Sequence, residues 1–153
     1  LYWQKQALLH ISTDKLIEWL DAKIQDLVPG EVKLDFIELM RGTICFPDEA
    51  VQWATILFSE ASALNFSIET KIFLRKVDLL YWQALLDLLE QGNADFTVLI
   101  KQLQERLNLK GKALFAPLRL ALTGRHDGPE LAKLFFLLGS KKIRERIHHA
   151  KNL

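Results

Sequence analysis

Apolar residues recur at intervals of three and four along nearly the whole chain, and this spacing is typical of helices that bury one face. Leu16, Leu20 and Ile24 show it first, after Ser12, which can cap a helix start, and before Pro29, which helps to stop the run. No stretch shows the alternation of apolar and polar residues that a half-buried strand needs. The sequence therefore predicts an all-α fold with no sheet.

Breaks between the periodic stretches divide the chain. The pattern predicts helices over residues 13–28, 33–41, 47–61, 67–91 (one or two helices) and 95–108. Pro47 suits a first helical turn, and Gly92-Asn93 and Gly111 suit helix ends. Asn65-Phe66-Ser67 is a polar break, so we expect two helical parts, residues 1–65 and 66–153.

Residues 110–140 place Pro117 and Arg119 inside an apolar helical pattern. Because proline removes a backbone hydrogen bond beyond the first turn, a helix beginning near residues 114–116 and ending at Gly124 is expected. Pro129 should open the next helix and Gly139 end it, with a basic last helix after Ser140. Arg119 near a helix start favours contact with a partner, and an ion pair inside the chain is the alternative.

Charge is distributed unevenly. Residues 1–100 carry 8 Lys/Arg against 15 Asp/Glu, a net of −7, whereas residues 101–153 carry 12 against 4, a net of +8. A basic end on an acidic body favours a polyanionic partner, and a solvated basic surface is the alternative. The candidate phosphate contacts are Lys101, Arg106, Lys110, Lys112, Arg119, Arg125, Lys133, Lys141, Lys142, Arg144 and Arg146.

Residues for catalysis or cofactor binding are few. Cys45, the one cysteine, lies between Ile44 and Phe46 and reads as a small buried hydrophobe. His148-His149 point about 100° apart on a helix, which makes a poor metal site, and no nucleotide-binding glycine motif occurs. The sequence predicts no catalytic residue, metal or cofactor in this chain. The four tryptophans fall within helical stripes and are expected in the core.

Hydropathy and the first residues of the chain bear on its cellular location and on whether it is part of a longer protein. No run of 18 apolar residues occurs and the first residues do not resemble a signal peptide, so a cytoplasmic protein that does not enter a membrane is expected. The chain begins with Leu1, and we therefore expect it to be a piece of a longer protein.

One long motif, K-G-K-A-L-F-x-P-L-R-x-A-L-T-G-x-x-x-G-P-E-L followed by L-L-G and a basic helix, resembles the C-terminal anticodon-binding region of bacterial-type glutamyl-tRNA synthetases. Residues 36–41 and 47–58 resemble an earlier part of that region more loosely. The motif residues are Lys110 to Phe115, Pro117 to Arg119, Ala121 to Gly124, Gly128 to Leu131, and Leu137 to Gly139.

The resemblance implies an all-helical, two-part anticodon-binding cage attached to a catalytic domain that joins glutamate to tRNA with ATP and Mg²⁺. The HIGH and KMSKS elements of that domain do not occur in this sequence. We therefore expect the chain itself to bind tRNA as a monomer without charging it, with ATP and Mg²⁺ belonging to the rest of the parent enzyme. The alternative is a helical protein–protein interaction module with a basic docking surface.

The resemblance also assigns individual roles. It implies that Arg119, Gly128, Pro129 and Leu131 approach the anticodon bases. It also implies that Lys101 stands at a position where the family carries a cationic residue. Family members that reject glutamine tRNA carry an arginine at the position of Thr43, and this arginine reads the third anticodon base. Because threonine offers one hydroxyl where arginine offers five donors, we hypothesise that the parent accepts both glutamate and glutamine tRNAs. Lys110, Lys112, Arg125, Lys141 and Lys142 are the expected phosphate contacts.

Overall fold

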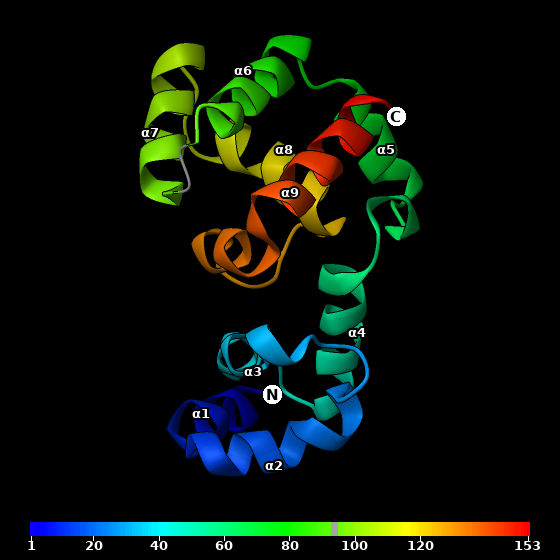
Figure 1. Ribbon diagram of the computed structural model, residues 1–153, viewed down its shortest axis with the longest axis vertical. Helices are drawn as coiled ribbons and strands as arrows, with labels where there is room; N and C mark the ends of the chain where they lie inside the picture. Colours follow the sequence, from blue (N-terminus) through cyan, green and yellow to red (C-terminus); the bar gives the residue numbers. More distant parts are fainter. Residues whose placement is uncertain (93–94) are drawn as a thin grey trace. The chain divides into compact units, whose positions relative to one another are not determined.

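The computed structural model describes residues 1–92 and 95–153, and the regular structure in these ranges is helical (Figure 1). The predicted all-α class is confirmed. In chain order the elements are α1 (Tyr2–His10), α2 (Thr13–Ile24), η1 (Gly30–Val32), α3 (Lys33–Arg41), α4 (Pro47–Phe58), η2 (Ala61–Ala63), α5 (Ile68–Arg75), α6 (Leu79–Glu90), α7 (Phe96–Leu107), α8 (Lys112–Thr123) and α9 (Leu131–Lys151).

Two compact units emerge from the contacts. Unit 1 comprises residues 1–59 and 128–137, and unit 2 comprises residues 60–127 and 138–153. The first half of α9 thus belongs to unit 1 and the second half to unit 2. Unit 1 has 6 Lys/Arg against 10 Asp/Glu, a net of −4, and unit 2 has 14 against 9, a net of +5. The expected division into domains at residue 65 stays a prediction. The contacts group residues 128–137 with the N-terminal part and residues 60–65 with unit 2.

Unit 1 is built on α2, which packs against both α3 and α4, while α1 contacts α3. The buried face of α2 carries the predicted Leu16, Leu20 and Ile24, all at 0 % exposure. Ser12 caps this helix by accepting a hydrogen bond from the amide of Lys15. The α1 helix was not among the helices expected from the sequence.

Unit 2 is held together by α6 packing on α7 and by α5 packing on α8. The side chains of Ser67, Asp78 and Asp95 cap α5, α6 and α7. Asn108 ends α7 in the left-handed conformation, with φ of 52°. The predicted helix end at Gly92-Asn93 lies partly outside the described residues, since Asn93 is not among them.

Helix α8 begins earlier than the sequence predicted. It starts at Lys112 because Gly111, with φ of 61°, turns the chain directly into the helix and accepts from the amides of Leu114 and Phe115. Pro117 therefore lies inside α8 and not in its first turn. The hydroxyl of Tyr81 donates to the Leu114 carbonyl (2.6 Å) in this part of α8, and burial raises the pKa of that tyrosine well above its usual value.

Gly139 breaks α9, as predicted. Its φ of 76° and ψ of 159° are not helical, so the helix before it ends and a second, basic helix follows. The first half begins at Leu131, two residues after Pro129, where the sequence placed the start.

Burial of the remaining side chains tests two further expectations. Cys45 is buried, as predicted. Trp53 and Trp82 are core residues at 4 % and 2 % exposure, whereas Trp3 is 81 % exposed in α1 and Trp19 lies at the surface border. The prediction of a core position is thus wrong for Trp3 and also for Trp19, which is 36 % exposed. In the part of the chain that the structure describes, no helix combines the length and apolarity needed to cross a bilayer.

Candidate functional site

A hollow of about 520 Å³ opens on α8 in unit 2, and Arg119 lies in its wall. Lys112, Phe115 and Ala116 line it from the same helix, and His126 lines it from the following loop. Arg119 is half-buried. Burial lowers the pKa of its guanidinium, and the charge of Asp127 partly offsets this effect, but an arginine remains protonated at neutral pH. The hollow therefore presents a fixed cation beside an aromatic ring.

The loop after α8 is shaped by Thr123 and Gly124. The hydroxyl of Thr123 donates to the carbonyl of Arg119 (2.9 Å) and accepts from the amide of Arg125 (3.1 Å). Gly124, in the left-handed conformation with φ of 71°, donates to the Leu120 carbonyl and ends the helix. These bonds fix the start of the loop that carries His126 and Asp127.

Arg146 is not a phosphate contact, although the charge pattern suggested one. Its side chain is 0 % exposed in the second half of α9 and donates to the carbonyl of Leu122 near the end of α8. Burial lowers the pKa of Arg146 to about 10, and the charge of Glu60 acts in the opposite direction. Arg146 therefore satisfies a backbone acceptor at a helix end.

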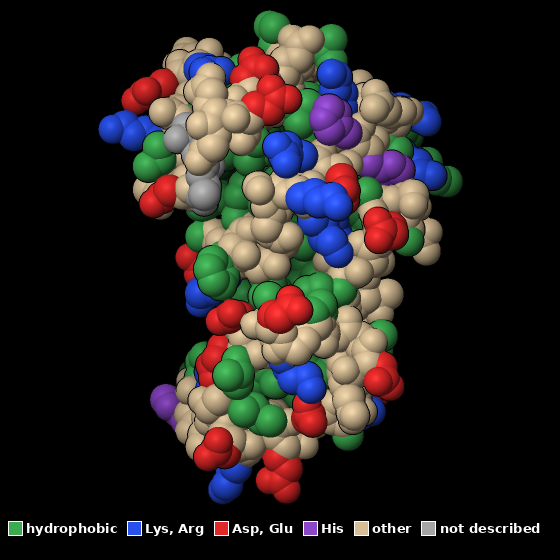
Figure 2. All heavy atoms as spheres, in the orientation of Figure 1, with side chains coloured by type: hydrophobic (Ala, Val, Ile, Leu, Met, Phe, Trp, Pro, Cys, Tyr) green, Lys and Arg blue, Asp and Glu red, His purple; other side chains and the backbone are tan. Residues whose placement is uncertain are grey.

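The expected phosphate contacts of unit 2 lie at or near its surface, whereas Lys133, another candidate, is exposed in unit 1. Figure 2 shows Lys and Arg side chains gathered over the second half of α9 on one face. Lys142 is half-buried, and its pKa is lowered by burial and by the charge of Arg146. Arg125 lies 3.5 Å from the carboxylate of Asp127. The exposed candidates in unit 2 are Lys101, Arg106, Lys110, Lys112 and Lys141.

The turn at Gly128 is pressed onto the indole ring of Trp53 in unit 1. A Cβ atom at Gly128 would lie 2.3 Å from Cη2 of that ring, and the φ of Gly128 is 133°. No other residue type fits this approach. Pro129 and Leu131 are buried, whereas Gly128 and Glu130 are exposed. The base contacts expected for Gly128, Pro129 and Leu131 stay predictions.

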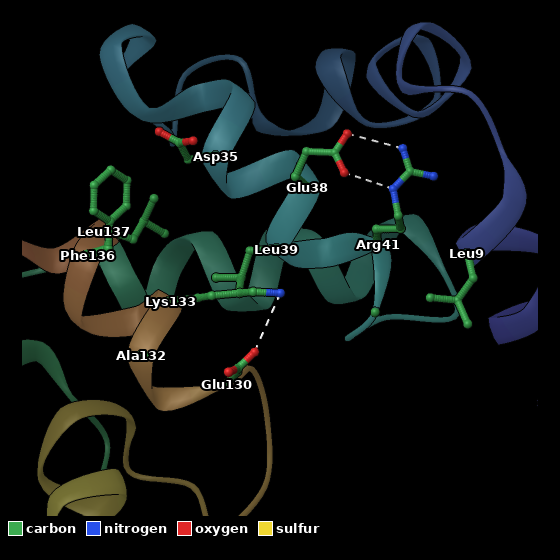
Figure 3. A pocket seen from close by; sticks show the side chains of 11 residues that line it. Leu9, Asp35, Glu38, Leu39, Arg41, Glu130, Ala132, Lys133, Phe136 and Leu137 are labelled. Carbon is green, nitrogen blue, oxygen red and sulfur yellow. Dashed lines mark hydrogen bonds and ion pairs between the residues drawn. The ribbon is translucent and has the colours of Figure 1, made fainter. Parts of the chain in front are cut away.

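Arg41 at the end of α3 uses all five of its N–H donors inside unit 1. Nε and Nη2 donate to the carboxylate of Glu38 (2.8 and 3.1 Å; Figure 3). Nη2 also donates to the Thr13 hydroxyl (3.3 Å). Nη1 donates to the carbonyls of Leu8 and Ile11 at the end of α1. The bonds from Arg41 and Thr13 lower the pKa of Glu38. Arg41 therefore joins α1 to α3.

Thr43 is half-buried, and its hydroxyl donates to the Leu39 carbonyl at 2.8 Å. Its single donor is thus engaged by the preceding turn. Neither Thr43 nor Arg41 presents an unused donor to a ligand in this conformation. Lys101, the remaining residue to which a base contact was assigned, is exposed on α7 in unit 2.

Phe115 and His126 line the Arg119 hollow but were not predicted. Phe115 precedes Arg119 by four residues, a spacing that places both on one helix face, so the sequence contained that signal. His126 lies beyond the helix end, and its position depends on the turn at Thr123 and Gly124. Among the described residues, no three His, Cys, Asp or Glu side chains form a group able to hold a metal ion.

A family model and individual relatives both match nearly the whole chain. Residues 11–151 match the family model described as Anticodon binding domain. Glutamate–tRNA ligase 2 of Nitrosococcus oceani is 36 % identical over 148 residues, which cover 97 % of this chain and 31 % of that protein. Glutamate–tRNA ligase 2 of Coxiella burnetii is 32 % identical over 149 residues, covering 97 % and 32 %. The chain thus spans about a third of these relatives.

The fold also matches a solved structure. A crystal structure of a glutamate tRNA ligase from Elizabethkingia meningosepticum, in complex with its amino acid, aligns with a TM-score of 0.77. The alignment covers 99 % of this chain and 31 % of that one at 21 % identity. At this level of identity the match concerns the fold.

Proposed function

The chain belongs to the anticodon binding domain family, and we propose that it binds the anticodon loop of a tRNA within a glutamate–tRNA ligase. The observation that carries the proposal is the Arg119 hollow in the basic unit. In the longer protein, this domain would hold the anticodon while a catalytic part joins glutamate to the tRNA with ATP and Mg²⁺.

The Arg119 hollow has the chemistry of a site for an unstacked base. RNA loops are read by side chains that stack on a base face and bond its edge. Phe115 offers a ring for stacking, and the guanidinium of Arg119 offers a planar set of donors one helical turn away. Lys112, at the rim, can meet a phosphate. The hollow supports recognition of a base and its backbone together.

The exposed cations of unit 2 would supply affinity that does not depend on sequence. Contacts from lysine to phosphate release counterions, so they add affinity that falls with salt. Lys101, Lys110 and Lys141 are exposed and suit this role. Base contacts from Arg119 would then select the anticodon, and the lysines would hold the backbone.

Replacing Arg119 with alanine should weaken binding to a tRNA that carries the glutamate anticodon by about 1–3 kcal/mol and reduce the preference for that anticodon. The variant Lys141→Ala is the matched control, because it should weaken binding to all tRNAs alike and lower the salt slope by about 1. Fluorescence anisotropy at several salt concentrations measures both. Equal losses of preference in the two variants would refute this division of roles.

We also propose that the parent enzyme is relaxed at the third anticodon base. The resemblance places a base-reading arginine where Thr43 stands, and the hydroxyl of Thr43 donates to the Leu39 carbonyl. The nearby Arg41 is saturated by Glu38, Thr13 and two carbonyl groups. Reading the base with Arg41 would therefore require breaking the contacts that join α1 to α3.

Introducing the missing side chain tests this proposal. The variant Thr43→Arg should favour cytosine over guanine at the third base by about ten- to a hundredfold, because an arginine–base contact is worth about 1–3 kcal/mol. The unchanged chain should bind both with nearly equal affinity. Thr55→Arg is the matched control, since the Thr55 hydroxyl also donates to the carbonyl four residues earlier (2.9 Å). A strong cytosine preference in the unchanged chain would contradict the proposal.

A further inference from the structure

A groove of about 640 Å³ runs through unit 1 between α3 and the first half of α9, with α1 at one end (Figure 3). None of the residues that line it was assigned a role in base recognition above. Its apolar lining residues are Leu9, Leu39, Ala132, Phe136 and Leu137, and its charged ones are Asp35, Glu38, Arg41, Glu130 and Lys133.

Most of the charges in the groove are already paired. Arg41 and Glu38 bond at 2.8 Å, and Lys133 lies 3.5 Å from Glu130. Asp35 differs, because no hydrogen bond or ion pair to its carboxylate is found within residues 1–92 and 95–153. Its oxygens are therefore available as acceptors at the end of the groove that Figure 3 shows beside Phe136.

Phe136 is the aromatic residue of this groove and is 75 % exposed. It follows Lys133 by three residues on α9, so the two residues occupy neighbouring positions of one helix face, and the ammonium group of Lys133 extends towards Glu130 (Figure 3). An exposed ring beside a lysine is the combination by which proteins hold a single-stranded nucleotide, the ring stacking on the base and the cation meeting its phosphate.

The position of the groove in the chain indicates the source of that nucleotide. Phe136 and Asp35 belong to unit 1, as do the Gly128 turn and Thr43. Gly42, next to Thr43, lines the groove itself. Residues 128–131 lead directly into the helix that carries Phe136. The groove is therefore continuous with the surface of unit 1 at which anticodon bases are proposed to bind.

We infer that this groove binds a further unstacked base of the same RNA loop, one that carries an exocyclic amino group. The base stacks on Phe136 and its amino group donates to Asp35. Lys133 exchanges its solvent-exposed 3.5 Å contact with Glu130 for the phosphate. The inference rests on the proposed function of the chain. Adenine, cytosine and guanine carry such an amino group, whereas uracil has carbonyl oxygens in place of amino groups and donates from its pairing edge through N3–H alone. The groove thus selects against uracil.

The first test removes the stacking ring. Phe136→Ala should weaken binding of the whole chain to an RNA stem-loop with the glutamate anticodon by about five- to a hundredfold, the range for one stacked base. Phe136→Trp should restore it. Phe73→Ala is the matched control, because Phe73 is a partly exposed phenylalanine of unit 2 (37 % exposed) outside this groove. Circular dichroism of each variant checks that the fold is intact.

The second test locates the base. Each adenine, cytosine and guanine of the loop is changed in turn to uridine, and binding is measured with the unchanged chain and with Asp35→Ala. One position should show about a tenfold loss with the unchanged chain and almost none with Asp35→Ala, because the bonded carboxylate is then absent.

Two results would overturn the inference: unchanged affinity in Phe136→Ala, or uridine losses that are the same with and without Asp35. The first would indicate a different occupant, such as an apolar side chain of a protein. If the unchanged chain prefers its anticodon and Phe136→Ala binds equally well, only the groove inference fails. If the unchanged chain has no anticodon preference, the proposed function fails and this inference with it.

Discussion

Alanine in place of Gly128 is expected to destabilise unit 1 by about 2–5 kcal/mol, through a steric clash and backbone strain together. Its Cβ atom would lie 2.3 Å from Cη2 and 2.6 Å from Cζ2 of Trp53. The ring has little room to move, because Trp53 is only 4 % exposed. The φ of 133° adds strain for any residue with a side chain.

Urea unfolding, followed by circular dichroism and tryptophan fluorescence, measures the change in free energy of unfolding. Gly42→Ala is the matched control, because an added Cβ at Gly42 would have no neighbour within 4 Å and its φ is −94°. The control should stay within about 0.5 kcal/mol of the unchanged chain. If both variants unfold at the same urea concentration, Gly128 does not pack against the Trp53 ring as described.

The second large effect is expected at Arg146. The variant Arg146→Ala should lower the free energy of unfolding of unit 2 by about 2–4 kcal/mol, because it opens a cavity and leaves the Leu122 carbonyl buried without that donor. Relief from burying a charge offsets part of this loss.

Lys141→Ala removes a charge from an exposed site on the same helix and serves as the control, with an expected change below about 0.5 kcal/mol. Trp82, the one tryptophan of unit 2, reports its unfolding by fluorescence. Salt dependence of RNA binding separates the roles further: a phosphate contact at Arg146 would lower the slope, whereas a structural role leaves it unchanged. An Arg146→Ala variant of unchanged stability with a lower slope would contradict the account.

Local sequence signals predicted most of the helices. Pro47 marks the start of α4 and Ser12 caps α2, as expected. Caps at Ser67, Asp78 and Asp95 also occur, and the one at Asp78 separates α5 from α6, a boundary that was left open. Gly139 interrupts α9 as expected. The start of α8 was predicted too late because two local rules compete there. Pro117 favours a start that leaves it in the first turn, whereas Gly111 can turn the chain directly into a helix at Lys112. The backbone follows Gly111 and accommodates the proline.

The candidate sites were less predictable, because they depend on contacts between distant residues. Nothing near Gly128 in the sequence indicates that Trp53 lies beneath it. For Arg146 a signal existed: the apolar face of the last helix, with Ile143, Ile147 and Ala150 buried, includes position 146. Similarly, Leu131, Leu134, Phe135 and Leu138 form the buried face of the first half of α9, and position 136 lies off that face. The bonds from Arg41 to the carbonyls of Leu8 and Ile11 could not be predicted, because they join residues that are far apart in the sequence.

A single titration shows whether the chain itself recognises the anticodon. The unchanged chain is titrated with a tRNA carrying the glutamate anticodon and with the same tRNA carrying an unrelated anticodon, at several salt concentrations. We expect about tenfold tighter binding to the glutamate anticodon, together with a steep fall in affinity as the salt concentration rises. Equal affinity for both anticodons would contradict it and would favour a basic protein-docking module.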